Sequence, residues 1–154
     1  MLLLGRSKGI LGLDIGTSSI KIVELEETKK GYQLKNFGTS LLPKETIVNG
    51  VLKNASALVN ALTNLTANLK TRTKYVATAV SGHPVIIKKI SVPTATEQEL
   101  ADSIQWEAEQ YIPFDLEEVN IDFEIIGPNE ANPEQMNVLL VAAKKSLINE
   151  YEEV

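Results

Sequence analysis

The chain has 154 residues, a net charge of -5 and 44% hydrophobic residues, enough to bury one ordinary core or two small ones. It has no cysteine, which excludes disulfides, thiolate metal sites and cysteine nucleophiles, and it has a single histidine. The apolar residues Leu2–Leu4 are too few for a signal peptide or a spanning helix, so we expect a cytoplasmic chain without direct membrane insertion.

A βββαβ pattern is predicted for the first half of the chain. Apolar runs near residues 10–13, 20–25 and 32–42 predict three strands, and "EETKKG" predicts a hairpin turn at Gly31. Four leucines at helical spacing predict an amphipathic helix capped by Asn54: Leu58, Leu62, Leu65 and Leu69. The stretch "YVATAVSG" then predicts another buried strand.

A second block of strand, helix, strand and strand follows. "VIIKKISVP" predicts a strand closed by Pro93, and Thr96 with Glu99 forms the capping box of a helix that Pro113 ends. "VNIDFEII" predicts a half-exposed strand, whereas "MNVLLVAAK" predicts one buried on both faces. We predict a first subdomain at 1–82, a small α+β subdomain at 83–143, and at 144–154 the start of a helix returning to the first.

Charge divides the chain near the same place. Residues up to Thr96 include 13 Lys or Arg and 5 Asp or Glu. Residues from Glu97 onward include 2 Lys or Arg and 15 Asp or Glu. This asymmetry indicates either two lobes with different partners or one acidic, solvated surface. The basic residues are scattered without interleaved aromatic residues, so no nucleic-acid partner is expected.

The segment "GILGLDIGTSSIKIVELE" carries a candidate phosphate site. Its first strand delivers Asp14 to a small-residue turn, in which Gly16 can take conformations closed to other residues and lets an anion approach the chain. Asp14 could hold a hydrated magnesium ion while Lys21 clamps phosphates. The alternative is a plain turn followed by a solvent-facing lysine, and the spacing alone does not decide between the two.

Three segments resemble known proteins. "LDIGTSSIKIVEL" resembles the first phosphate motif of the actin, sugar kinase and Hsp70 ATPase superfamily. "SGHPVIIKKISVP" and "WEAEQYIPFDLEEVNIDFEII" resemble segments of the PilM family of type IV pilus assembly proteins. The resemblance spans nearly all of residues 9–154. It implies an α/β fold: an actin-like (ribonuclease H-like) subdomain with a mixed sheet, plus an inserted FtsA-like α+β subdomain, truncated so that the second lobe is absent.

The resemblance also implies ligands. In the full-length protein, Asp14 would hold Mg²⁺ through water, Lys21 would neutralise the phosphates of ATP, and the turn between them would face the β and γ phosphates through Gly16, Thr17, Ser18 and Ser19. No catalytic residue is assigned. We expect this chain alone to bind no cofactor tightly and to have little or no ATPase activity, and hydrolysis by the full-length protein stays open.

The partner implied by the resemblance is the N-terminal cytoplasmic peptide of the inner-membrane protein PilN, docked in a groove between the two subdomains. The protein would then be peripheral at the inner membrane, within the pilus assembly complex that serves twitching motility. The alternative is an FtsA-like polymerising or hydrolysing ATPase of cell division or filament assembly. An apolar face left without the second lobe would also favour self-association.

Trp106 is a candidate interface residue. On the helix predicted to end near Ile112, one apolar face carries Leu100, Ile104, Ala108 and Tyr111, and Trp106 points away from it. Because tryptophan is enriched in interface hot spots, the ring could contact a partner. The alternative is that it lies under the loop "GPNEANPEQ" or the neighbouring subdomain.

Overall fold

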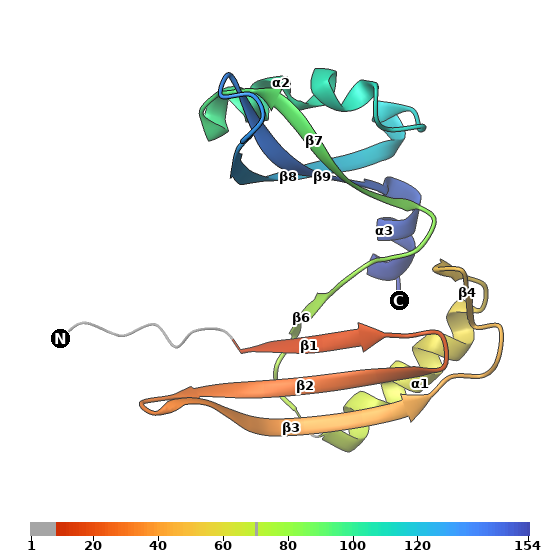
Figure 1. Ribbon diagram of the computed structural model, residues 1–154. Helices are drawn as coiled ribbons and strands as arrows, with labels where there is room; N and C mark the ends of the chain where they lie inside the picture. The colour runs from red at the N-terminus through yellow and green to blue at the C-terminus, as the bar shows by residue number, and fades with distance from the viewer. Residues whose placement is uncertain (1–8, 70) are drawn as a thin grey trace. The chain divides into compact units, whose positions relative to one another are not determined.

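The computed structural model describes residues 9–69 and 71–154, so the predicted segment Leu2–Leu4 lies outside the described residues. The chain divides into two compact units, one up to Ala79 together with Val154 and one from Val80 to Glu153 (Figure 1). The division falls after residue 79 rather than 82, and the last helix groups with the second unit because it directly continues a strand there. Within the described ranges, no helix is both long and apolar enough to cross a membrane.

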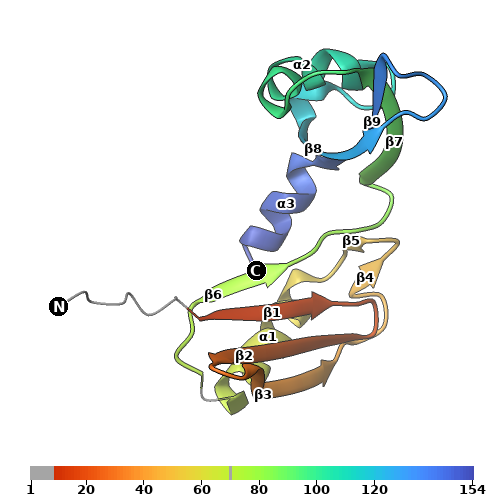
Figure 2. The ribbon, with the colours of Figure 1, turned by 60° about the vertical axis from the view of Figure 1, so that its left-hand side comes forward.

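The first unit is a four-stranded mixed sheet covered by a helix. Its strands are β1 (Ile10–Ile15), β2 (Ser19–Thr28), β3 (Gly31–Leu41) and β6 (Tyr75–Thr78), in the order β3-β2-β1-β6. The first three form an antiparallel meander, and β6 lies parallel to β1 after a crossover through α1 (Ala55–Leu69) (Figure 2). A short hairpin that the sequence did not predict precedes the helix: β4 (Ile47–Val48) and β5 (Val51–Leu52).

Helix α1 begins as predicted and packs closely on the sheet. The Asn54 side-chain oxygen accepts a hydrogen bond from the Ala57 amide at 3.0 Å, which satisfies one of the free amides of the first turn. Leu58 and Leu65 are buried against the sheet. A Cβ atom added to Gly38 of β3 would lie 2.7 Å from Leu65 Cδ1, so the absence of a side chain at Gly38 allows the helix to approach.

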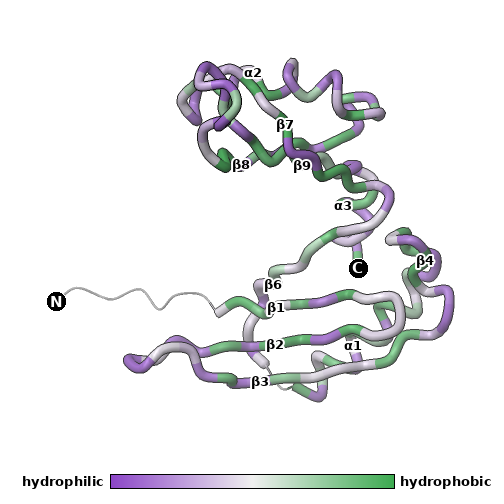
Figure 3. The backbone as a smooth tube through the Cα atoms, in the orientation of Figure 1, coloured by the Kyte–Doolittle hydropathy of each residue, from purple (hydrophilic) through white to green (hydrophobic). Residues whose placement is uncertain are grey.

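The face of this sheet opposite α1, here called the open face, is largely exposed. It carries large apolar side chains that are each about half exposed or more, among them Ile10, Leu25, Tyr32, Leu34, Phe37 and Leu41. The tip of the β2–β3 hairpin is hydrophilic (Figure 3). The prediction of a buried strand at 75–82 was wrong: β6 ends at Thr78 and all four of its residues are exposed, because it is an edge strand.

The second unit is a three-stranded antiparallel sheet under a helix. Its strands are β7 (Val85–Pro93), β8 (Val119–Pro128) and β9 (Gln135–Lys144), in the order β7-β9-β8. Its helices are α2 (Glu97–Glu109), the short 3-10 helix η1 (Leu116–Glu118) and α3 (Lys145–Glu152). The predicted capping box is confirmed, because the Thr96 hydroxyl accepts from the Glu99 amide and the Glu99 carboxylate accepts from the Thr96 amide.

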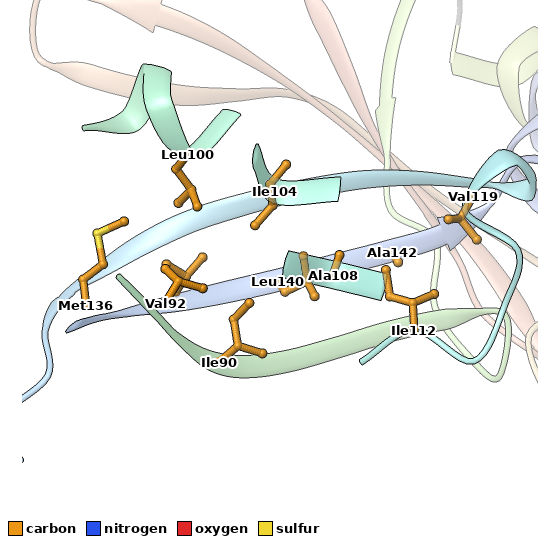
Figure 4. Close-up of a cluster of buried hydrophobic side chains, with 11 residues drawn as sticks. Ile90, Val92, Leu100, Ile104, Ala108, Ile112, Val119, Met136, Leu140 and Ala142 are labelled. Carbon is orange, nitrogen blue, oxygen red and sulfur yellow. The ribbon is translucent and has the colours of Figure 1, made fainter. Parts of the chain in front are cut away.

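The core of the second unit lies between α2 and one face of the sheet. Leu100, Ile104 and Ala108 of α2 pack with Val138 and Leu140 of β9, both fully buried (Figure 4). The prediction that β9 is buried on both faces was wrong. Its burial alternates, because α2 covers only one face and the side chains between the buried ones stay partly exposed.

The predicted fold class is confirmed. The first unit has the βββαβ order with a mixed sheet, and the second has the strand-helix-strand-strand order of a small α+β unit. The strands of the two units belong to separate sheets.

Candidate functional site

Asp14 and Lys21 are direct neighbours across the β1–β2 pair. Their positions are opposite each other in the ladder, and Lys21 Nζ lies 2.6 Å from Asp14 Oδ2. Both side chains project from the open face and remain accessible, with 65% of Asp14 and 48% of Lys21 exposed. The sequence predicted that the turn would bring the two residues together, and the ladder does so. An exposed carboxylate beside an ammonium can exchange this partner for a bound cation or anion.

The turn between the two strands is tight. The Gly16 amide donates to the Ser19 carbonyl at 3.0 Å, and the Ser18 carbonyl accepts from the Leu42 amide at 2.9 Å. A Cβ atom on Gly16 would lie 3.1 Å from the Ser19 carbonyl oxygen. The predicted unusual backbone conformation of Gly16 was wrong, since its φ lies outside the left-handed region. Close approach of the backbone, and not an unusual dihedral, is what makes a side chain at Gly16 costly.

The turn also presents hydroxyl groups. Thr17 and Ser18 are exposed, and Ser19 is partly buried. Within residues 9–69 and 71–154, the hydroxyls of these three residues form no hydrogen bond to other protein groups. They are therefore available to a ligand that accepts hydrogen bonds, such as a phosphate.

A shallow pocket of about 490 Å³ adjoins the ion pair on the open face. Gly12 lines it, Val23 and Phe37 provide apolar surface, and Asp14 and Lys21 contribute the charges. The pocket residues fit magnesium only in part. Mg²⁺ commonly keeps several waters and takes one or two carboxylates together with phosphate oxygens. The described residues contain no cluster of three or more groups that could ligate a metal, so Asp14 would act together with a bound phosphate.

Glu24, which the sequence interpretation did not single out, is a buried charged residue of the first unit. Its carboxylate accepts hydrogen bonds from Lys35 Nζ at 2.8 Å, Asn36 Nδ2 at 2.6 Å and Thr73 Oγ1 at 2.8 Å. The bonds from Lys35 and Asn36, with a smaller one from Thr73, lower the pKa of Glu24 to about 2, although burial opposes this shift. The available signal was its place in the series Ile20, Ile22, Glu24, which faces α1.

A β-bulge explains how Glu24 reaches two residues of β3. Glu24 is paired with Asn36 and Leu25 with Leu34, so Lys35 is the extra residue on β3. At such a bulge, two successive side chains oppose one residue of the other strand. Lys35 and Asn36 both bond the carboxylate, and Thr73 ties it to the segment that enters β6. Glu24 therefore holds β2 to β3 and to the segment that leads into β6. The candidate site is built on β2 and its neighbour β1.

Trp106 lies on the solvent side of α2, with 78% of the residue exposed. Leu100, Ile104 and Ala108 on the opposite side of the helix are buried, as predicted. The loop that follows β8 therefore does not cover the ring. A role for Trp106 at an interface stays a prediction.

Comparisons with known proteins identify the family. The family model for the type IV pilus assembly protein PilM matches residues 12–154. This chain belongs to the PilM family. A chain of the solved PilM-PilN type IV pilus biogenesis complex is 33% identical and superposes with a TM-score of 0.81, covering 96% of this chain and 44% of that one. This chain thus spans less than half the length of the PilM chain that it matches.

A second solved structure shares the fold alone. It is the cytoplasmic domain of EpsL, an inner-membrane component of the type II secretion system of Vibrio cholerae. It is 13% identical, with a TM-score of 0.53, and the match covers 94% of this chain and 51% of that one.

The part of the chain that the PilM family model matches begins at Gly12, so it contains the whole turn from Asp14 to Lys21.

Proposed function

We propose that this chain is the peptide-docking part of an actin-like scaffold for type IV pilus assembly, and that its ligand is the N-terminal cytoplasmic peptide of a PilN-type inner-membrane protein. The observation that carries the proposal is the similarity to the PilM chain of a PilM-PilN complex across 96% of this chain. The scaffold would then be cytoplasmic and held at the inner membrane by this partner.

Calorimetric titration of the 154-residue chain with a synthetic PilN N-terminal peptide tests the proposal. We expect saturable binding with one peptide per chain, because a peptide that gains main-chain hydrogen bonds and apolar pockets needs no catalysis. A peptide of the same composition in scrambled order is the control. Absence of heat above dilution at high micromolar peptide, from a chain with a normal circular dichroism spectrum, would contradict peptide docking.

We also propose that Asp14, Gly16, Lys21 and the turn hydroxyls form one side of an ATP site. The support is local: a paired carboxylate and ammonium, a tight turn and hydroxyls without protein partners adjoin one pocket. When bound, Mg²⁺ would supply charge neutralisation for the phosphates. Lys21 would turn from Asp14 to a phosphate oxygen, and Asp14 would then be free to hold water on the metal.

Nucleotide binding can be tested separately from peptide docking. We expect the 154-residue chain to bind a fluorescent ATP analogue weakly and in a magnesium-dependent way, and Lys21→Ala to weaken this binding further. Lys30→Ala, at an exposed lysine of the hairpin tip, is the matched control. Equal affinity in the Lys21→Ala variant and the wild type would remove Lys21 from the proposed site.

A further inference from the structure

The two edge strands of the second unit differ in charge. The order β7-β9-β8 leaves one side of β7 and one side of β8 without a strand partner among the described residues. β7 carries Lys88 and Lys89, whereas β8 carries Asp122 and Glu124, and all four are exposed. Lys89 and Glu124 flank the same residue of β9, Leu139, so they lie at opposite ends of one row across the sheet.

Space for an additional strand lies beside β8. A groove of about 980 Å³ is lined by five consecutive residues of β8, from Val119 to Phe123. Successive side chains of a strand point to opposite faces, so a space that contacts five residues in succession runs along the strand edge. Ala101, Ile104 and Gln105 of α2 also line the groove, which gives it a partly apolar wall.

One amide of this edge already has a substitute partner. Asp122 Oδ1 accepts a hydrogen bond from the Phe123 amide at 2.9 Å. A carboxylate does not fit between two paired strands, so this amide points away from β9 and toward the free edge. The carboxylate occupies the position where the carbonyl of an added strand would accept the same hydrogen bond.

We infer that the partner for this edge is a second copy of the chain, whose β7 pairs with β8 of the first. Two β8 edges would bring Asp122 and Glu124 against their own copies, and two β7 edges would do the same with Lys88 and Lys89. Like charges directly opposite on neighbouring strands are destabilising, so both symmetric pairings are disfavoured. A lysine edge and an acidic edge attract each other. If the row that joins Lys89, Leu139 and Glu124 continued into the second copy, Lys89 of the second copy would lie beside Glu124 of the first.

This pairing has a consequence for assembly. Joining two different surfaces is a heterologous contact, and such a contact continues from copy to copy unless its rotation closes a ring. Each added chain leaves one free lysine edge and one free acidic edge. The inference concerns the second unit only, so it does not depend on the nucleotide or peptide sites proposed above.

Sedimentation velocity of charge-reversal variants tests the inference. We expect the wild-type 154-residue chain to associate with increasing concentration and less so at high salt. The double variants Lys88→Glu/Lys89→Glu and Asp122→Lys/Glu124→Lys should each lose roughly tenfold or more in association constant. An equimolar mixture of the two should associate again, because each carries the edge that complements the other.

Control variants separate this edge pairing from other contacts. Lys29→Glu/Lys30→Glu, at the exposed hairpin tip of the first unit, should leave association unchanged. If a double variant does not fold by circular dichroism, Lys89→Glu and Glu124→Lys are used singly in the same design. A monomeric wild type at all concentrations, association that ignores the charge reversals, or failure of folded variants to associate when mixed would each overturn the inference.

Discussion

Replacing Glu24 with glutamine removes the charge at the centre of the first unit while keeping the shape of the side chain. The Glu24 side chain is 2% exposed and pairs with a lysine whose side chain is 50% exposed. In the folded chain, the hydrogen bonds from Lys35 and Asn36 hold its pKa at about 2, below the usual 4.5. The native structure therefore favours the ionised carboxylate.

The size of the effect follows from the pKa. A shift of one pKa unit corresponds to about 1.4 kcal/mol of stability. A pKa of about 2 in place of 4.5 therefore gives an upper limit of about 3 kcal/mol for the contribution of the Glu24 charge to the free energy of unfolding at neutral pH. Solvent screening at the half-exposed Lys35 reduces this value. We therefore expect Glu24→Gln to lower the free energy of unfolding by about 2 kcal/mol at pH 7.

The pH dependence of stability tests the direction of the effect. Because folding lowers the pKa, the stabilisation is fully present above pH 4.5 and is lost as the pH falls toward 2. Urea unfolding at pH 7 and pH 3, followed by circular dichroism, should show a difference between wild type and variant that shrinks on acidification. Glu26→Gln, an exposed carboxylate on the same strand, is the control. Equal stability at pH 7, or a difference that persists unchanged at pH 3, would refute the reasoning.

Two further predictions concern packing and exposure. Gly38→Ala should lower the free energy of unfolding by about 1–3 kcal/mol, because the added Cβ would lie 2.7 Å from Leu65 Cδ1. Urea titration measures this difference, and an unchanged free energy of unfolding would mean that α1 shifts freely to make room. Trp106→Ala should leave the melting temperature nearly unchanged because the residue is 78% exposed, and a large decrease would show that the ring supports the core.

Local patterns were enough to predict most elements and a turn that brings Lys21 back toward Asp14. The Asn54 cap and the Thr96–Glu99 box are short-range signals, and both are present in the structure. The prediction failed for β6 and β9, because an apolar strand does not reveal whether a helix covers one of its faces or both. Burial of such strands depends on neighbours distant in the sequence.

The network around Glu24 was also beyond a local interpretation. Its partners come from a bulge in β3 and from the segment after α1, and Thr73 is 49 positions away along the chain. A single carboxylate in an otherwise apolar series was the visible signal. Without the register of β2 and β3, the sequence could not identify which cations or hydroxyls would satisfy it.

The bulge at Lys35 determines which changes in length the β2–β3 hairpin can tolerate. Phe37 and Leu41 occupy odd positions of β3 and Leu34 an even one, yet all are exposed, because the extra residue resets the alternation. Deleting Lys35 would restore a regular ladder with every remaining residue on its present face, at the cost of the cation beside Glu24. Inserting one more residue there would also keep the faces, because three steps between Leu34 and Asn36 alternate regularly, but it would move the distal part of β3 by two residues against β2. Natural variants of this hairpin should therefore be shorter by one residue more often than longer by one.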